Sequence, residues 1–504
     1  MIVINRKYWR RICWGALAIC SATVVAMATD QPQWGELYSR NMVSQAKGLP
    51  DRFDPASGLN VKWIADIGTE THATPVIAGG KVYIGTNNKN PRNDKHIGDR
   101  GILMCFDEKT GKYLWQLVVP KITTSIYWDW TGSGVCSPVT VESNLVYVVS
   151  SRGEVMCLDP EGMANGNQGP FKDEARHSTP EGLPVVETSP TDADILWLYD
   201  TIKECGIRQH DAAHASILID GRFLYINTSN GVDDTHRHIA SPDAPSLIVI
   251  DKVTGKLVAT DNEHIGPNIF HCTWASPSLG VVNGRKLIFY AGPNGIVYAF
   301  EPITEVKTEV QKLKKVWWYD SDPTAPKENV HRWTANRQEG PSTFHAMPVF
   351  VDGRLYVAGG GDIWWGKRQS WLRCLDATLT GDVTATAQKW SYPLNRHTLS
   401  TPAVWNGLVF AADSGQKIHC VDAVTGKPYW THDIQGDMWS STLVADGKLY
   451  AGTRKKEFVV LAASKEKQVF STNLLDSAIS GSPVAANGTL YVTTQKKLYA
   501  LGSK

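Results

Sequence analysis

The feature that most constrains this chain is a four-part repeat, whose clearest copy spans Leu399–Trp430. Four short runs of strand-forming residues lie within it: Ser400–Trp405, Leu408–Ala412, Lys417–Ala423 and Lys427–Trp430. Asn406-Gly407 separates the first two runs, and Asn-Gly between apolar runs signals a tight hairpin because such turns need positive φ. The repeat therefore predicts a four-stranded antiparallel meander.

Eight copies of this unit can be aligned along the chain. Their first strands begin near Thr74-Pro75, Ser137-Pro138, Ser216, Ser276-Pro277, Met347-Pro348, Thr401-Pro402, Ser441-Thr442 and Ser482-Pro483. Small sheets in series cannot each bury both faces alone, but they can do so by stacking face to face around an axis. The sequence predicts an all-β protein, an eight-bladed β-propeller of four-stranded antiparallel blades; an open solenoid of sheets is the alternative.

The two ends of the repeat region predict how the ring closes. The eighth copy has only three strands and ends at Leu501, while Asn60–Trp63 matches a fourth strand such as Lys389-Trp390. We expect this N-terminal strand to complete the last blade, which removes exposed sheet edges. The propeller then occupies residues 59–504, and residues 29–58 form a lead-in.

The first 28 residues have the features of a signal peptide. Arg6, Lys7, Arg10 and Arg11 precede an apolar run from Ile12 to Ala26, and Ala26-Met27-Ala28 is a small-x-small cleavage site. A membrane anchor is the alternative, but the run is shorter than the about 20 residues that span a bilayer. We expect export to the periplasm or the extracellular space, with no transmembrane span in the mature chain. Lipidation at Cys20 stays open.

The net charge and the positions of the cysteines limit which partners and which disulfide bonds we expect. The formal net charge of +1 gives no reason to expect nucleic acid binding, and we expect a monomer. Four of the nine cysteines occupy one repeat position: Cys105, Cys157, Cys374 and Cys420. They are interpreted as small buried residues on separate blades rather than as a disulfide framework.

The repeats resemble those of a known family. Elements such as Ser482-Pro483, Leu490–Thr493 and Asp422–Trp430 are similar to the pyrroloquinoline-quinone-like (PQQ-like) repeat, found in quinoprotein alcohol dehydrogenases and in outer-membrane assembly propellers of the BamB type. Asp422–Trp430 resembles the family's tryptophan-docking motif, and Asp107–Trp115 is a stretched copy. The tryptophans late in each repeat are expected to pack between blades: Trp63, Trp115, Trp197, Trp317, Trp390 and Trp430.

The resemblance implies a fold more firmly than an activity. The quinone-dependent dehydrogenases of the family carry a vicinal cysteine pair, and some carry a haem module, but no two cysteines here are adjacent and no Cys-x-x-Cys-His occurs. No quinone or calcium ligands are assigned. No cofactor is assigned, and both PQQ and a divalent metal stay open.

Candidate functional residues gather where one face of a propeller is expected. The loops that enter the innermost strands, and those between second and third strands, open on a single face around the axis, here called the funnel face. The candidate binding residues are His72, His210, Asp211, His214, His271, Trp274, Arg337, His345, His397 and Trp439. His96, His236 and His238 lie in the longer loops, with Tyr127, Trp128, Trp130, Trp333, Trp364 and Trp365 on the same face.

These residue types suggest two kinds of chemistry. Imidazoles and carboxylates together can hold a divalent metal, with His72, His214, His271 and His345 as candidate ligands, or supply a general base. Aromatic faces beside polar groups suit a sugar or a flat ring. The alternative to both is that these loop residues have no functional role and are only solvated or packed.

Three long loops on the funnel face favour a binding pocket there. They are Asn87–Arg100, Ser229–Ala244 and Gly359–Ser370, whereas the insertion Pro160–Asp194 is expected at the opposite rim.

Three functions are open. The leading hypothesis is an exported propeller that binds a small polar ligand, a saccharide or a cell-envelope partner protein. The second is an enzyme, either a quinone-linked oxidoreductase or a metal- or His-dependent enzyme acting on carbohydrate. The third is an outer-membrane assembly factor.

Overall fold

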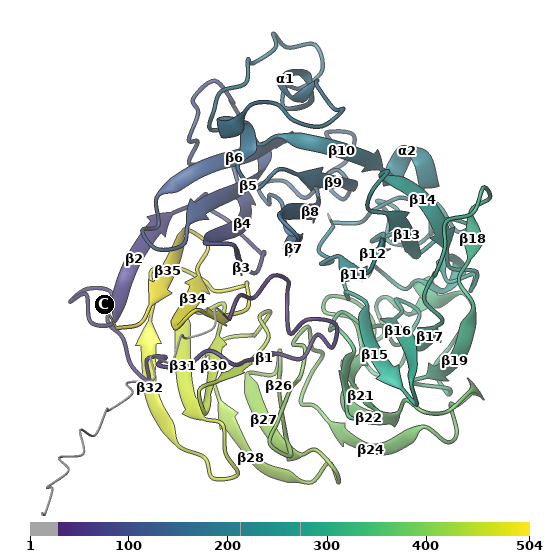
Figure 1. Ribbon diagram of the computed structural model, residues 1–504. Helices are drawn as coiled ribbons and strands as arrows, with labels where there is room; N and C mark the ends of the chain where they lie inside the picture. The colour runs from purple at the N-terminus through teal and green to yellow at the C-terminus, as the bar shows by residue number, and fades with distance from the viewer. Residues whose placement is uncertain (1–28, 212, 273, 504) are drawn as a thin grey trace, which may run out of the picture.

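Eight small sheets surround a central axis as the blades of a β-propeller (Figure 1). This computed structural model describes residues 29–211, 213–272 and 274–503, and the predicted signal peptide, residues 1–28, lies outside them. The predicted eight-bladed propeller is confirmed. Within the described ranges, no helix has the length and apolar character that crossing a bilayer requires.

Each of the first four blades is an antiparallel meander. Blade one contains β3 (Val76–Ala78), β4 (Lys81–Asn87), β5 (Arg100–Asp107) and β6 (Tyr113–Pro120). Blade two contains β7 (Thr140–Glu142), β8 (Leu145–Val149), β9 (Glu154–Leu158) and β10 (Ile195–Asp200). Blade three contains β11 (Leu218–Asp220), β12 (Phe223–Asn227), β13 (Leu247–Asp251) and β14 (Lys256–Thr260). Blade four contains β15 (Ser278–Val282), β16 (Arg285–Ala291), β17 (Ile296–Phe300) and β19 (Lys315–Asp320).

The remaining blades repeat this order. Blade five contains β20 (Val349–Val351), β21 (Arg354–Gly360), β22 (Ser370–Asp376) and β24 (Gln388–Pro393). Blade six contains β25 (Ala403–Trp405), β26 (Leu408–Asp413), β27 (Lys417–Asp422) and β28 (Pro428–Asp433). Blade seven contains β29 (Leu443–Ala445), β30 (Lys448–Gly452), β31 (Glu457–Ala462) and β32 (Val469–Leu474). Blade eight contains β33 (Val484–Ala486), β34 (Thr489–Thr493), β35 (Lys497–Leu501) and β2 (Val61–Asp66).

A few short elements lie outside this pattern. The strands β1 (Val43–Ser44), β18 (Gln311–Lys312) and β23 (Gly381–Asp382) add parallel edges to blades seven, three and four. The helices are α1 (Glu174–His177) and α2 (Thr201–Cys205), with 3₁₀ turns at Gly162–Asn165, Gly266–Asn268 and Val330–Trp333.

The ring closes as predicted from the ends of the repeat region. Strand β2 pairs antiparallel with β35, and the register places Val61 opposite Leu501 and Trp63 opposite Ala500. The last blade is therefore built from both ends of the propeller, which leaves no unpaired blade edge at the junction.

The turns between first and second strands explain why the blades form locally. Asn406 and Gly407 have φ of 53° and 76°, and Asn487 and Gly488 have φ of 50° and 68°. Two consecutive positive φ values match the twist of a type I′ hairpin, which these residues tolerate at low cost. The Asn-Gly signals therefore mark the turns that were predicted from them.

The late tryptophans join neighbouring blades, as predicted. Each indole Nε1–H donates to a carbonyl at the corner of the next blade: Trp63 to Glu108, Trp115 to Pro160, Trp197 to Lys252, Trp317 to Ala377, Trp390 to Ala423 and Trp430 to Ser464, at 2.9–3.3 Å. Apolar clusters fill the same interfaces, for example Val82 and Ile84 of blade one with Tyr491 and Leu498 of blade eight. The core is thus a series of inter-blade layers.

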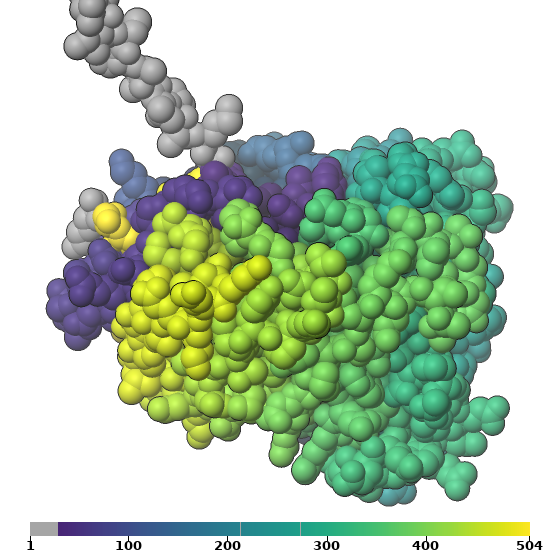
Figure 2. Space-filling view, turned by 90° about the horizontal axis from the view of Figure 1, so that it is seen from below, coloured from purple at the N-terminus to yellow at the C-terminus, as the bar shows by residue number. Residues whose placement is uncertain are grey.

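The lead-in runs across the face opposite the funnel face and contacts every blade. It meets the eight innermost strands or their entries in turn: Gln31 at Ile77, Pro32 at Val141, Tyr38 at Leu279, Ser39 at Phe350, Arg40 at Ser216, Asn41 at Val404, Val43 at Val444 and Ser44 at Ala485. Figure 2, a view from the side of the ring, shows purple N-terminal atoms spread along the upper face of the disc. The lead-in therefore covers one end of the central axis.

The long insertion of blade two differs from its expected place. It leaves β9 at the rim opposite the funnel face, as expected, but then returns along the outside of the ring, where α1 lies in Figure 1. His177 of α1 forms a hydrogen bond with Glu154, at the opposite end of β9. The expectation that the whole insertion stays at the opposite rim is therefore wrong, because its helix packs against the blade edge.

Candidate functional site

A cavity of about 430 Å³ lies on the funnel face over the axis. It is lined by Glu70, His72, Tyr127, Trp130, Ser133, Cys136, Asp211, His214, His236, His271, Trp274, Trp364, Trp365, Trp439 and Arg454. These residues come from loops entering innermost strands and from loops between second and third strands, in blades one, two, three, four, five and seven. The ring closure brings these distant segments together, and we call this space the upper cavity.

A smaller cavity of about 50 Å³ lies below it along the axis. His72, Cys136, His214, Trp274 and Trp439 line both spaces, and His345 lines only the smaller one. Trp34 of the lead-in also lines the smaller space, here called the lower cavity. The lead-in thus forms the floor of the axial channel whose mouth is the upper cavity.

Five aromatic rings form a closed series around the axis, and four of them line both cavities. Successive ring centroids lie 5.9 Å apart for Trp439 and Trp364, 5.8 Å for Trp364 and Trp274, 4.5 Å for Trp274 and His214, 6.3 Å for His214 and His72, and 5.5 Å for His72 and Trp439. Edge-to-face and tilted contacts at these separations are the favoured aromatic geometries. The floor of the upper cavity is therefore apolar but contains imidazole nitrogens.

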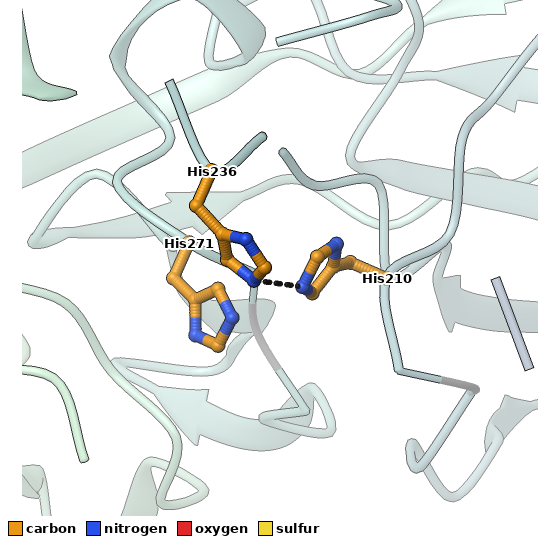
Figure 3. Close-up of side chains that lie close together, drawn as sticks. All are labelled: His210, His236 and His271. Atoms are coloured by element: carbon orange, nitrogen blue, oxygen red, sulfur yellow. Dashed lines mark hydrogen bonds between the residues drawn. The ribbon is translucent and has the colours of Figure 1, made fainter. Parts of the chain in front are cut away.

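Three histidines meet at one wall of the upper cavity (Figure 3). One ring nitrogen from each of His210, His236 and His271 lies within 4.8 Å of the other two. Nε2 of His210 is 3.1 Å from Nε2 of His236. His210 and His271 are buried, and His236 is half-buried. We call these three residues the histidine cluster.

The outer nitrogens of two cluster members are fixed by neighbours. Nδ1 of His210 lies 2.9 Å from the carbonyl oxygen of Val232, and Nδ1 of His271 lies 3.1 Å from Oδ2 of Asp362. For His210 this places the proton on Nδ1 and leaves the Nε2 lone pair available. Burial alone would lower the pKa of His271, but Cys272 and Asp362 outweigh it and raise that pKa well above its usual range, so an ion would have to displace a proton from Nε2 of His271. Burial, together with the neighbouring imidazoles, lowers the pKa of His210 to about 2, so this ring is neutral.

Asp362 links the histidine cluster to the aromatic rings. Its Oδ2 accepts hydrogen bonds from His271 and from Nε2 of His345, at 3.1 and 3.0 Å. Its Oδ1 accepts the backbone N–H groups of Trp364 and Trp365. Burial alone would raise the pKa of Asp362, but the two histidines outweigh it and hold that pKa well below its usual range.

Asp211 is held in an unusual position beside the cluster. Its φ is 65°, in the left-handed region, and its backbone N–H donates to the carbonyl of Tyr127. Its oxygens lie 3.6 Å from Nε2 of His210 and 3.9 Å from Nε2 of His271. Burial raises the pKa of Asp211 to about 6. The strained backbone thus directs a partly buried carboxyl toward the histidines.

Several buried polar atoms around the cavities accept or donate no hydrogen bond within the described residues. They are Nδ1 of His72, Oδ1 of Asp211, Nε1 of Trp274 and Nδ1 of His345. Such atoms are costly to leave unpaired, and in native proteins they commonly face a ligand, water or an ion.

The predicted site residues fall into three groups. His72, Asp211, His214, His271, Trp274 and Trp439 line the upper cavity. His210 touches its wall through His236, and His345 lines the lower cavity. Arg337 and His397 line neither cavity within the described chain; Arg337 instead donates to the carbonyl oxygen of Trp364 at 2.7 Å and supports that loop.

The four histidines predicted as metal ligands do not meet at one point. His72 and His214 have ring centroids 6.3 Å apart, whereas His345 and His271 each donate a hydrogen bond to the same oxygen of Asp362, Oδ2. The compact group instead combines His271 with His210 and His236. His236 was recognised as a funnel-face residue but not as a member of the site.

Asp362 and Arg454 were missed by the sequence reasoning. Asp362 follows β21 in a long second-to-third-strand loop, and Arg454 follows β30 at the equivalent place in blade seven. Both residues lie in loops between second and third strands, which the repeat predicts to lie on the funnel face, so their place in the repeat could have identified them.

The cavity does not fit the quinone cofactor of the dehydrogenases that the repeats resemble. PQQ carries several carboxylates, and Arg454 is the one Lys or Arg among the described residues that line the upper cavity. The carboxyl groups of Glu70 and Asp211 would disfavour an anion there. A hydrogen bond from His72 lowers the pKa of Glu70, which favours its negatively charged form. No vicinal cysteine pair is present to stack on the quinone.

A comparison with protein families identifies the repeats. The family described as "Outer membrane protein assembly factor BamB" matches residues 46–231 and 368–501, more than half of the chain.

Two curated proteins are similar in sequence. Lupanine 17-hydroxylase [cytochrome c] of Pseudomonas sp is 23% identical over 431 residues, which cover 75% of this chain and 51% of that protein. Quinohemoprotein alcohol dehydrogenase of Comamonas testosteroni is 26% identical over 136 residues, covering 23% of this chain and 19% of that protein. The chain thus spans about half of the length of the first relative and about a fifth of the second.

Solved structures share the fold at low identity. BamB from Moraxella catarrhalis has a TM-score of 0.51 and 11% identity, covering 88% of this chain and 98% of that one. A europium-containing methanol dehydrogenase also has a TM-score of 0.51 and 11% identity, covering 94% and 98%. Likeness at this identity concerns the fold alone.

Proposed function

This chain belongs to the family of the outer membrane protein assembly factor BamB, and on that premise we propose that it is an exported propeller that binds a small polar, ring-shaped ligand, such as a saccharide, in the upper cavity. The observation that carries the proposal is the combination of aromatic rings and unpaired buried polar atoms in one space. The volume of about 430 Å³ lies within the range of about 300–1,000 Å³ typical of small-molecule sites.

Each part of the cavity has a role in such binding. Trp364, which is 39% exposed, offers a face on which a sugar ring can stack, and the ring plane of Trp439 meets it at 88°. Nδ1 of His72 and Nε1 of Trp274 supply an acceptor or donor for hydroxyl groups. Arg454 lies 3.9 Å over the ring of Trp439 and offers further donors. Since Glu70 balances this cation, a neutral polar ligand is favoured over a polyanion.

A titration with a panel of neutral mono- and disaccharides tests this function. We expect at least one sugar to change the intrinsic tryptophan fluorescence, and Trp364→Ala to weaken its binding about tenfold, equivalent to about 1.4 kcal/mol. Trp318→Ala is the matched control, because Trp318 lies on the outer strand β19 and contacts Lys315. Binding of no sugar, or equal weakening by both variants, would contradict the proposal.

An assembly role at the outer membrane is the second candidate, and the family match favours it. In that case the protein would co-purify with a membrane β-barrel protein, and Trp364→Ala would leave the association unchanged. A third outcome, quinone absorbance in the purified protein, would favour an oxidoreductase related to the curated relatives.

A further inference from the structure

We propose that the histidine cluster binds one divalent transition-metal ion of the zinc class at the wall of the upper cavity. The proposal deepens the proposed function, on which it rests for the ligand that would meet the ion in the same cavity. Three features support this assignment: the positions of the three imidazoles, the groups behind them and the space in front of them.

The spacing of the ring nitrogens is close to that of a metal site. Zinc–nitrogen bonds of about 2.0–2.1 Å in tetrahedral geometry place two ligand nitrogens about 3.3 Å apart. The Nε2 atoms of His210 and His236 are 3.1 Å apart, and all three cluster nitrogens lie within 4.8 Å. Small side-chain rotations, most easily of half-buried His236, would bring the third nitrogen to ligand distance.

The groups behind the rings are those that support metal-binding histidines. A ligating imidazole usually donates its other N–H to a carboxylate or a backbone carbonyl, which fixes the tautomer and the ring orientation. The carboxylate of Asp362 does this for His271, and the carbonyl of Val232 does it for His210. Since Asp362 is itself held by His345 and two backbone N–H groups, His271 is rigidly oriented.

The three rings lie close together, and a hydrogen bond between Nε2 of His210 and Nε2 of His236 accounts for one of the contacts. The ring centroids of His210 lie 4.8 Å from those of both His236 and His271. Tyr127 and Trp365 pack on His236 at 4.7 and 5.2 Å, so much of the surrounding space is apolar. An ion would replace the hydrogen bond between His210 and His236 and would be held in a setting that is partly shielded from water.

The donor set selects the class of ion. Neutral imidazoles favour borderline metals such as Zn²⁺, Cu²⁺ and Ni²⁺, whereas Ca²⁺ and Mg²⁺ prefer oxygen ligands. Oδ1 of Asp211, which has no hydrogen-bond partner within the described chain, faces the same group and would balance part of the positive charge. His236, His271 and Asp211 all line the upper cavity, so the ion would face the bound ligand.

Calorimetry with zinc chloride tests the proposal on the full mature chain, after dialysis against a chelator. We expect one equivalent to bind to the wild type. His236→Gln should weaken the affinity at least about 100-fold, since even loss of a supporting group behind a ligand costs about 10–100-fold. The matched control is His238→Ala, an exposed histidine two residues away in the same loop. No zinc binding by the wild type, or equal affinity in His236→Gln, would overturn the proposal.

A second measurement does not depend on any variant. Addition of Co²⁺ to the chelator-treated wild type should produce visible absorption of a four-coordinate site, and Zn²⁺ should displace it in equal amount. Absence of a cobalt spectrum would also overturn the proposal.

The sugar titration separates this inference from the proposed function. If saccharides bind in a Trp364-dependent manner to protein that binds no zinc, the metal site is wrong and the ligand site stands. If zinc binds through the cluster but no saccharide binds, the ligand assignment fails and the metal site stands.

Discussion

Single buried residues of this protein show how local pairing determines the charge state of a group. Glu154 at the start of β9 is buried and accepts hydrogen bonds from His177, Arg152 and Ser150. Burial alone would raise its pKa, but hydrogen bonds and charge from these partners lower that pKa to about 2. The charged carboxylate therefore anchors the insertion of blade two to the ring.

This anchor predicts an acid-sensitive contact. A carboxyl whose folded-state pKa lies below its unfolded value contributes stability above about pH 4.5, and the contribution is lost as the pH falls toward 2. His177→Ala should raise the pKa of Glu154 and move the acid unfolding transition, followed by circular dichroism, to higher pH. An unchanged midpoint relative to His238→Ala would show that the pair does not stabilise the fold.

At the scale of the element, the docking of tryptophan on glycine explains why the repeat carries Thr-Gly-Lys before its fourth strand. Gly426 has φ of 70°, and a Cβ there would lie 2.6 Å from Cδ2 of Trp390 of the preceding blade. Gly407 has φ of 76° but no atom within 4 Å of its would-be Cβ. The two glycines therefore share the backbone requirement and differ in the inter-blade contact.

The pair gives a matched stability test. Both Gly426→Ala and Gly407→Ala should cost about 1–2 kcal/mol for the left-handed backbone. Gly426→Ala should lose about 1–3 kcal/mol more, because overpacking must displace the indole. Denaturant unfolding measures the difference, and equal losses would show that the tryptophan contact contributes little.

The blade-forming elements were predictable from the sequence because their causes are local. Asn-Gly at Asn406 produced the positive φ values of its turn, and the motif at Asp422–Trp430 produced the indole contact to the next blade. The strand bounds shifted by a few residues: β25 begins at Ala403 rather than Ser400, and β28 extends to Asp433 rather than ending at Trp430.

The sequence predicted which face of the propeller carries the candidate site, but not which side chains meet there. The repeat register placed His72, His214, His271 and Trp274 on loops around the axis, and all line the upper cavity. Which rings meet depends on the paths of long loops, which follow no repeat. The loop Ser229–Ala244 places His236 against His210, and Oδ2 of Asp362 bridges His345 and His271.

At the scale of the whole molecule, the lead-in ties the ring together. Arg40 is fully buried, and its guanidinium donates to the carbonyls of Trp34, Pro277 and Ser216 and to the hydroxyl of Ser216. Burial lowers its pKa to about 9. Since Trp34 also lines the lower cavity, this segment both joins the blades and closes the channel beneath the candidate site. The path of the lead-in could not be predicted from the sequence, because it depends on where the assembled blades place their innermost strands.

On our proposal, ring closure brings His210, His236 and His271, from loops of separate blades, together as one metal site on the funnel face. Anomalous diffraction at the zinc absorption edge, from crystals soaked in zinc chloride, tests it most directly. We expect a strong peak between the rings of His210, His236 and His271, facing the upper cavity. Peaks confined to other surfaces, or none at the histidine cluster, would contradict it.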